Sequence, residues 1–156
     1  MASTRLLTAQ KYISHFANLD KGLLASLLSE SYTHQFAPTS LNPPGPFTKT
    51  GFLAHGASLS EIMIGFPVTA KEYLECEVSN RVVVWATSEA HFKEEVMDGD
   101  EAGWEYKAEY VFMFWMDDSG EKVERTVEFL DSAATKERLF ELMARARANL
   151  ENIKRV

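Results

Sequence analysis

Hydrophobic and polar positions change their spacing along the chain, and this change divides it into helical and extended parts. Before residue 67, apolar side chains recur mainly three and four positions apart, the spacing that places them on one face of a helix. From 67 to 131 they alternate with polar ones, as in strands that bury one face. The patterns predict helices over 4–18, 21–30, 49–65 and 133–150, and strands over 31–36, 68–78, 81–96, 104–116 and 122–130.

Polar residues and glycines indicate where these elements begin and end. Asp20, Thr48 and Ser132 each precede a helical pattern, where a side-chain oxygen can accept a hydrogen bond from a free backbone N–H. Glycine-containing turns at 98–103 and 117–120 separate the long strands, which predicts a consecutive antiparallel meander. Helices before and after a meander predict an α+β fold, and the length of 156 residues favours a single domain, 1–156.

One strand of the meander presents an apolar face that carries two phenols. A buried Tyr hydroxyl needs a hydrogen-bond partner, because burying it unpaired costs about 1–3 kcal/mol. Glu128, on the neighbouring strand, is a candidate partner, and we expect Tyr106, Tyr110 and Glu128 to converge on one apolar pocket of roughly 300–1,000 Å³. Alternation places on this face Trp104, Tyr106, Ala108, Tyr110, Phe112, Phe114 and Met116.

The alternation of the next strand favours a solvent-facing position for the Glu128 side chain, outside the pocket. It shares a face with the polar Glu124 and Thr126, whereas the opposite face is mostly apolar, so this pattern by itself indicates a solvated carboxylate. Inside the cavity, the apolar wall would instead raise the pKa of Glu128 toward neutrality and suit it to general acid or base catalysis.

Three further polar residues are candidates for the site. Adjacent strand residues point to opposite faces, so at most one of His34 and Gln35 is expected in the cavity, where Gln35 could bind a substrate carbonyl or merely pair with a backbone amide. His55 lies on the apolar stripe of the third helix and is either a core histidine or a proton shuttle at the cavity wall. The four histidines lack the close spacing of a zinc motif, so no metal is expected.

Composition narrows the class of partner. Hydrophobic residues make up 46% of the chain and aromatic residues 12%, which suits a large core or a cavity for an apolar ligand. The net charge is −7 and no basic block stands out, which argues against nucleic-acid binding. Cys76 is the only cysteine, so no intramolecular disulfide can form. Without a long apolar run, we expect a cytoplasmic protein with no membrane partner.

The other face of the strand 104–116 is also apolar, with Val111, Met113 and Trp115. Apolar residues on both faces imply that both are covered. The helices and the pocket can cover one face, and a second subunit is the simplest cover for the other. We therefore expect a homodimer.

Three segments resemble sequences of the fungal SnoaL-like proteins of the NTF2-like superfamily, and the likeness covers nearly the whole chain. This resemblance implies an NTF2-like cone, in which N-terminal helices pack on a strongly curved antiparallel sheet and a helix ends the chain. It also implies a dimeric pocket protein that uses no cofactor. The segments are Tyr32-Thr-His-Gln-Phe-Ala-Pro38 with the following Ser40, Leu41, Pro43 and Pro44; Tyr106-x-x-Glu109-Tyr110; and Glu128-Phe-x-Asp131-Ser132.

The resemblance further implies an isomerase or cyclase that acts on a hydrophobic secondary metabolite, namely a polyketide, a meroterpenoid or an indole alkaloid. Tyr106, Tyr110 and Glu128 are spaced similarly to the pocket residues of the fungal semipinacolases that form spiro-indoxyl alkaloids. Those proteins have an arginine on the first strand where this chain has Gln35, and a neutral amide stabilises a developing oxyanion less than a guanidinium does.

The resulting hypothesis is general acid–base catalysis on a carbonyl- or enol-bearing substrate. Glu128 moves the proton, Tyr106 and Tyr110 hold the substrate oxygen, and Gln35 and His55 add contacts to the substrate. The alternative is a non-catalytic dimeric carrier or sensor of an apolar ligand, because one fold can host many functions. A carrier needs no ionisable group at the floor of its cavity.

Overall fold

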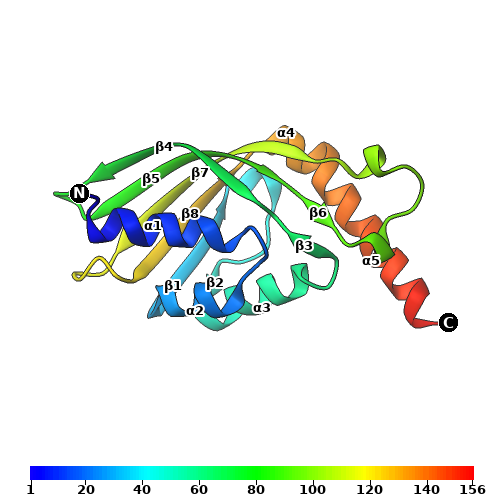
Figure 1. Cartoon of the computed structure of the whole chain (residues 1–156), viewed down its shortest axis with the longest axis horizontal. Coiled ribbons are helices and arrows are strands. Elements are labelled where there is room, and N and C mark those ends of the chain that lie inside the picture. Colours follow the sequence, from blue (N-terminus) through cyan, green and yellow to red (C-terminus); the bar gives the residue numbers. More distant parts are fainter.

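A curved six-stranded sheet forms the body of the protein, and three helices cover one of its faces (Figure 1). The structure is a computed structural model that describes residues 1–156. The N-terminus and the C-terminus lie at opposite ends of the molecule (Figure 1). The strands of the sheet are β1 (Leu28–Ala37), β2 (Phe47–Thr48), β4 (Val68–Cys76), β5 (Arg81–Glu89), β7 (Lys107–Met116) and β8 (Val123–Leu130); a separate pair is β3 (Met63–Gly65) and β6 (His91–Phe92).

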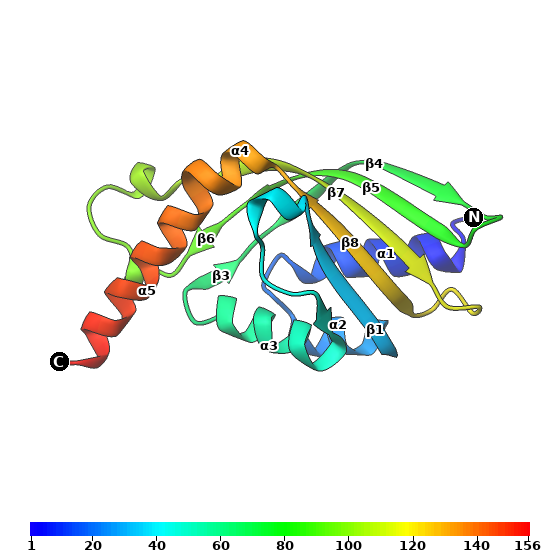
Figure 2. The ribbon, with the colours of Figure 1, turned by 180° about the vertical axis from the view of Figure 1, so that it is seen from behind.

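The helices fall into an N-terminal group and a terminal segment. The first three lie on one side of the sheet, and Figure 2 shows α2 and α3 next to the lower half of β1. None of the helices is long and apolar enough to cross a membrane. The helices are α1 (Thr4–His15), α2 (Lys21–Leu27) and α3 (Lys49–Leu59), then α4 (Ser132–Ala134), a π-helical turn η4 (Thr135–Leu139) and α5 (Phe140–Lys154), with 3₁₀ turns at Thr39–Leu41, Glu94–Val96 and Glu101–Trp104.

The strand order is β2-β1-β8-β7-β5-β4. The predicted α+β fold and the consecutive antiparallel meander of β4, β5, β7 and β8 are confirmed. The first strand joins the far edge of this meander and runs parallel to β8. In that register His34 lies beside Thr126, and Phe36 lies beside Glu128. The parallel pairing therefore brings the histidine of β1 next to the carboxyl group of β8.

Several predicted boundaries are wrong where tertiary contacts override the local pattern. The third helix ends at Leu59 and not at 65, because Met63–Gly65 pairs with β6 as a strand. The second helix ends at Leu27, since Leu28 already begins β1. The predicted strand 81–96 is divided into β5 and β6.

The predicted helix caps are correct at two of three positions. The side chains of Asp20 and Thr48 accept hydrogen bonds from the backbone N–H groups of Leu23 and Gly51, at 2.9 and 3.2 Å. At the last helix the cap is Asp131 and not Ser132, because the Asp131 carboxylate accepts a hydrogen bond from the N–H of Ala134, at 3.1 Å. Asp131, the first residue after β8, has a longer side chain than Ser132 and bonds the first helical turn.

The predicted apolar face of β7 is confirmed as the centre of the core. All seven residues from Trp104 to Met116 on that face are buried. Rings from α1 pack on it: Tyr12 lies 4.7 Å from Phe114, and Phe16 lies 5.6 Å from Phe112, between ring centroids. The sheet and α1 therefore share one aromatic core.

Gly65 is where the chain passes closest to the end of α1. The N–H of the next residue, Phe66, donates to the carbonyl of Phe16 at 2.8 Å. A Cβ added at Gly65 would lie 2.1 Å from the backbone oxygen of Ala17. Only glycine fits here, because that oxygen belongs to the backbone and cannot rotate away.

We therefore expect Gly65→Ala to lower the free energy of unfolding by at least about 2 kcal/mol, the usual scale of a forced steric overlap. Gly56→Ala is the matched control. A Cβ at Gly56 meets nothing within 4 Å, and alanine favours a helix interior by roughly 0.5–1 kcal/mol. Urea denaturation of both variants measures the difference. Equal stability of the two variants would contradict the packing described.

Candidate active site

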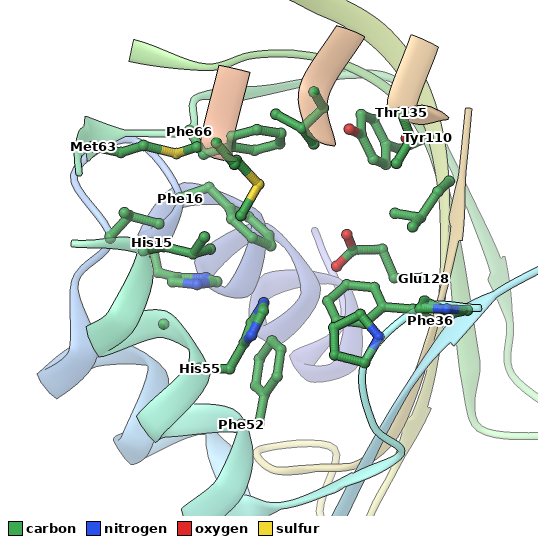
Figure 3. A pocket seen from close by; sticks show the side chains of 18 of the residues that line it. His15, Phe16, Phe36, Phe52, His55, Met63, Phe66, Tyr110, Glu128 and Thr135 are labelled. Atoms are coloured by element: carbon green, nitrogen blue, oxygen red, sulfur yellow. The ribbon is translucent and has the colours of Figure 1, made fainter. Parts of the chain in front are cut away.

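A cavity lies between the helix-covered face of the sheet and the π-helical turn η4 (Figure 3). Thirteen of its 20 lining residues are hydrophobic, and its volume is about 120 Å³. The expected volume of roughly 300–1,000 Å³ is therefore wrong. Aromatic rings from Phe16, Phe52 and Phe66 occupy much of the space, and Pro43 and Pro44 form part of its wall.

Glu128 lies inside this cavity, with 6% of its surface exposed. Figure 3 shows its carboxyl group pointing into the hollow between Tyr110 and His55. The interpretation of Glu128 as a solvated strand residue is wrong, because β8 turns its polar side inward. Thr126 is buried on the same face, whereas Phe129 on the opposite face is 46% exposed. The predicted alternation holds from Arg125 onward, but an irregularity before Arg125 buries Val123 and exposes Glu124. The assumption that the apolar face is the inner one is wrong.

Tyr110 lines the cavity together with Glu128, and Tyr106 stands behind it. The two phenol oxygens are 2.6 Å apart, so one hydroxyl donates to the other. Tyr106 itself lines a separate surface hollow with Trp104. Burial raises the pKa of both phenols above the usual value, so both stay protonated at neutral pH. The structure thus joins the three predicted residues in one group, with only Tyr110 and Glu128 at the cavity itself.

His34 and Gln35 point to opposite faces of β1. His34 has no exposed surface, and its ring stacks on Phe52 with the centroids 3.8 Å apart. Gln35 instead lines a shallow hollow beside the proline-rich loop at Pro43. Gln35 therefore does not line the cavity that holds Glu128. Burial of the aromatic His34 ring, packed between Phe36 and Phe52, decides which of the two residues faces inward.

A polar network that the sequence analysis missed lies behind Glu128. The Nε2 atom of His34 is 3.5 Å from Oε1 of Glu128. On the other side of the ring, Nδ1 is 2.9 Å from the hydroxyl of Tyr32, which also contacts the hydroxyls of Tyr12 at 2.9 Å and Thr126 at 2.8 Å. The available signal was the spacing of Tyr32 and His34, two apart on one strand face.

Two more histidines lie at the cavity wall. His55 is half-buried on α3, with its ring 5.5 Å from that of Phe36, and burial lowers its pKa. His15, which the sequence analysis did not single out, is buried on α1 beside the backbone oxygen of Tyr12. Burial lowers the pKa of His15 to about 4. The signal for His15 was its place one helical turn after Tyr12.

Burial makes the cavity electrically neutral at pH 7. It raises the pKa of Glu128 to about 8 and lowers the pKa of His34 to about 3. An ionised group in an apolar, enclosed space loses its hydration, so each group favours its uncharged form. The site therefore combines a protonated carboxyl, a phenol and neutral imidazoles within an apolar wall. Such a set can donate and accept protons but cannot bind a charged ligand by ion pairing.

The raised pKa of Glu128 predicts a pH-dependent stability. In the unfolded chain this carboxyl ionises near pH 4.5, and in the folded protein it ionises near pH 8, so the folded state binds one more proton between these values. The stabilisation is complete below pH 4.5 and is lost toward pH 8, by about 1.4 kcal/mol per pH unit. Glu128→Gln should therefore gain stability relative to the wild type as the pH rises through this window.

Urea denaturation of both proteins from pH 4 to 9 measures this difference. His15 and His34 oppose the effect below pH 6.5, because their pKa values are lowered on folding, but both residues are present in each protein and their contributions cancel. Parallel stability curves for the two proteins would contradict the buried, protonated Glu128.

Comparison with known proteins identifies relatives that are named for fungal biosynthesis clusters. No family model matches the chain. Austinoid biosynthesis clusters protein H from Penicillium brasilianum is 30% identical over 139 residues, which cover 85% of this chain and 88% of that protein. The solved structure of AusH from Aspergillus nidulans is 27% identical, with a TM-score of 0.69 over 85% of this chain and 86% of that one.

Two more distant structures share the fold. BvnE pinacolase from Penicillium brevicompactum has a TM-score of 0.76 at 19% identity, covering 90% of this chain and 91% of that one. A protein from Shewanella denitrificans that is named for its likeness to SnoaL-like polyketide cyclases has a TM-score of 0.69 at 12% identity, covering 90% of this chain and 99% of that one. The NTF2-like fold implied by the sequence motifs is confirmed by these structures.

Proposed function

The chain belongs to the fungal SnoaL-like proteins of the NTF2-like superfamily, together with austinoid cluster protein H, and we propose that it is a cofactor-free isomerase or cyclase. The observation that carries this proposal is the buried, protonated Glu128 in an apolar cavity that Tyr110 also lines. A buried ionisable group lowers stability whenever it ionises, so a protein that only carried an apolar ligand would gain nothing from it.

Glu128 is the proton carrier in this proposal. Its pKa of about 8 lies near a working pH of 7, where both protonation states are accessible and proton transfer is efficient in each direction. Glu128 pairs with Phe112 across the sheet, which places Tyr110 diagonally opposite on the same face. A small substrate can therefore contact the carboxyl and the phenol at the same time.

Tyr110 binds the substrate oxygen. In the proposed arrangement Tyr106 donates its hydroxyl proton to Tyr110, and Tyr110 donates its own to a carbonyl or enolate oxygen. Such a donor is strengthened as negative charge develops on that oxygen, because the surrounding apolar wall excludes water. Tyr106 acts through Tyr110 and does not itself contact the substrate.

The neutral cavity specifies the class of substrate. The lining has no lysine or arginine, and its histidines are uncharged at pH 7, so a carboxylate or a phosphate would find no partner there. We propose an uncharged, hydrophobic molecule with a carbonyl or enol group, such as a polyketide, a meroterpenoid or an indole alkaloid. The names of the relatives, an austinoid cluster protein and a pinacolase, support this class.

The main prediction concerns Glu128→Gln, which keeps the shape of the side chain and removes its ionisation. Turnover should fall by about 100-fold or more, the usual contribution of a general acid or base, while ligand affinity should stay within about tenfold. Apolar polyketide and prenylated-indole compounds are first screened by thermal shift, and converted ligands are then identified by mass spectrometry. Full turnover in Glu128→Gln would favour proton transfer by His55, whereas ligand binding without conversion in the wild type would favour the carrier function.

The two tyrosines should differ in their effects. Tyr110→Phe removes the hydrogen bond to the substrate and should weaken both binding and turnover. Tyr106→Phe removes only the support of Tyr110 and should have a smaller effect on each. Steady-state kinetics of both variants shows which substitution causes the larger loss of binding and turnover. A larger loss in Tyr106→Phe would contradict its position behind Tyr110.

We also propose that the protein is a homodimer that pairs through the outer face of the sheet. Trp85, Val111 and Phe129 lie side by side on three adjacent strands of this face, and Trp85 and Phe129 are 41% and 46% exposed. Large apolar residues grouped in this way favour association with a matching surface. Trp115 lies near this group, between Arg81 and Arg125.

Phe129→Glu should convert the dimer to a monomer, because an unpaired carboxylate would be buried at the interface. Ile64→Glu is the matched control, since Ile64 is 61% exposed but lies on β3, away from this face. Light scattering at micromolar concentration should give twice the chain mass for the wild type and for the control. A monomeric wild type would contradict the proposed dimer.

A further inference from the structure

The His34 side chain contains a buried nitrogen whose hydrogen bond is missing. The Nε2 atom is fully buried and has no hydrogen-bond partner within normal distance. Its nearest polar neighbour is Oε1 of Glu128, at 3.5 Å. A buried nitrogen of this kind is expected to have a partner, because leaving it unpaired costs free energy. The position of the protons around the ring decides what that partner can be.

The opposite side of the ring fixes the position of its proton. The hydroxyl of Tyr32 donates to Oγ1 of Thr126 at 2.8 Å, so Tyr32 has no second proton to offer. Its oxygen must therefore accept from Nδ1 of His34, at 2.9 Å. The hydroxyl of Tyr12 lies 2.9 Å from that oxygen and 3.4 Å from Nδ1, and it donates to the nearer atom, the Tyr32 oxygen. The proton of the neutral imidazole is thus on Nδ1, and Nε2 carries a lone pair that faces Glu128.

The ring has little freedom to change this orientation. It stacks on Phe52 at 3.8 Å with an interplanar angle of 10°, and the edge of Phe36 packs against it at 4.7 Å. Turning the ring over would break the contact with Tyr32 and expose a different edge to the apolar wall. Burial also lowers the pKa of His34 to about 3, so the ring does not take up a second proton at neutral pH.

We propose that His34 is a positioning residue for the reaction: its Nε2 lone pair accepts a hydrogen bond from the protonated carboxyl of Glu128 at Oε1, and the other carboxyl oxygen, Oε2, faces the substrate. This role rests on the proposed function of Glu128 as the proton carrier. The proton stays on Glu128 and no transfer to the imidazole occurs. To act as a base, Glu128 must first be ionised, and Oε2 then takes the proton from the substrate and later returns it. Between these two steps, a half-turn of the carboxyl group about its Cγ–Cδ bond brings the new O–H to the Nε2 lone pair of His34, which stabilises the acid.

The lone pair also affects the ionised state of Glu128. A carboxylate oxygen facing a nitrogen lone pair is repelled, so the same contact that stabilises the acid destabilises its anion. The other titratable groups around the cavity are His55 on α3, His15 on α1 and Tyr110 on β7. His55 is the group whose charge would favour the carboxylate, and its lowered pKa keeps it neutral at pH 7.

The first experiment is ¹⁵N NMR of protein labelled in histidine. The His34 signals are assigned by their loss in His34→Asn. We expect a protonated Nδ1 and an unprotonated Nε2, with no titration between pH 5 and 8. A proton on Nε2, or a ring that titrates near its usual pKa, would overturn the proposal. This result does not depend on knowing the substrate.

A matched pair of tyrosine variants tests the effect on Glu128. Tyr32→Phe removes the acceptor 2.9 Å from Nδ1 and leaves only the Tyr12 hydroxyl, which is 3.4 Å away and can donate to Nδ1. The imidazole is then free to place its proton on Nε2 and donate to the Glu128 carboxylate. The carboxyl pKa, followed by ¹³C NMR of labelled glutamate, should then fall by about one unit, which is a tenfold change in the ionisation equilibrium. At the imidazole ring, Tyr12→Phe loses only the 3.4 Å contact with Nδ1 and keeps the 2.9 Å contact with Tyr32, so it should leave both the tautomer and the pKa unchanged.

The outcomes separate this inference from the proposed function. If Glu128→Gln keeps full activity but His34 has the expected tautomer and Tyr32→Phe lowers the Glu128 pKa, the function is wrong and the hydrogen bond is right. If Glu128→Gln loses activity but Tyr32→Phe and Tyr12→Phe give the same Glu128 pKa, the role of His34 is overturned and the role of Glu128 remains.

Discussion

The site depends on one constraint, a carboxyl group held where water and counterions cannot stabilise its charge. Glu128 is buried in an apolar cavity, and burial raises its pKa to about 8. Every polar group near it is also uncharged at neutral pH, since burial lowers the pKa values of the nearby histidines and raises that of Tyr110. The cavity is thus suited to moving a proton on a neutral molecule, not to binding an ion.

The fold supplies this environment through two strands that are far apart in the sequence. The parallel pairing of β1 with β8 places His34 and Thr126 side by side, and α1 and β1 bring two phenols to the same point. The connected hydroxyls and the stacked Phe52 ring hold His34 in one orientation. A rigid network behind a catalytic carboxyl is how proteins fix the direction of its proton.

The relatives use the same architecture over a wide range of sequence identity. A pinacolase at 19% identity and a protein named for its likeness to polyketide cyclases at 12% identity share the cone with this chain, so the fold alone does not select a reaction. The difference must lie in the side chains that point into the cavity. In this protein those are a carboxyl group, a phenol and neutral imidazoles, with the amide of Gln35 outside.

The sequence by itself determined the order of elements, the antiparallel meander and the apolar face of β7, because each follows from the period of hydrophobic residues over a long segment. Two of the three helix caps followed from single residues, and the motifs with Tyr106, Tyr110 and Glu128 were enough to place the chain in its family. The local pattern also showed that only one of His34 and Gln35 could face inward.

Only the tertiary structure decided that His34 and not Gln35 faces inward, and which face of β8 is buried. Alternation gives the two faces of a strand but not which of them meets the helices, and here the polar face of β8 is the inner one. The contact of His34 with Glu128 arises from a parallel strand pairing between residues about 90 positions apart, as does the bond from Tyr32 to Thr126 with a separation of 94, and Tyr12 joins this network from α1. No local period encodes such a pairing, because it depends on how the sheet curves and closes around its cavity.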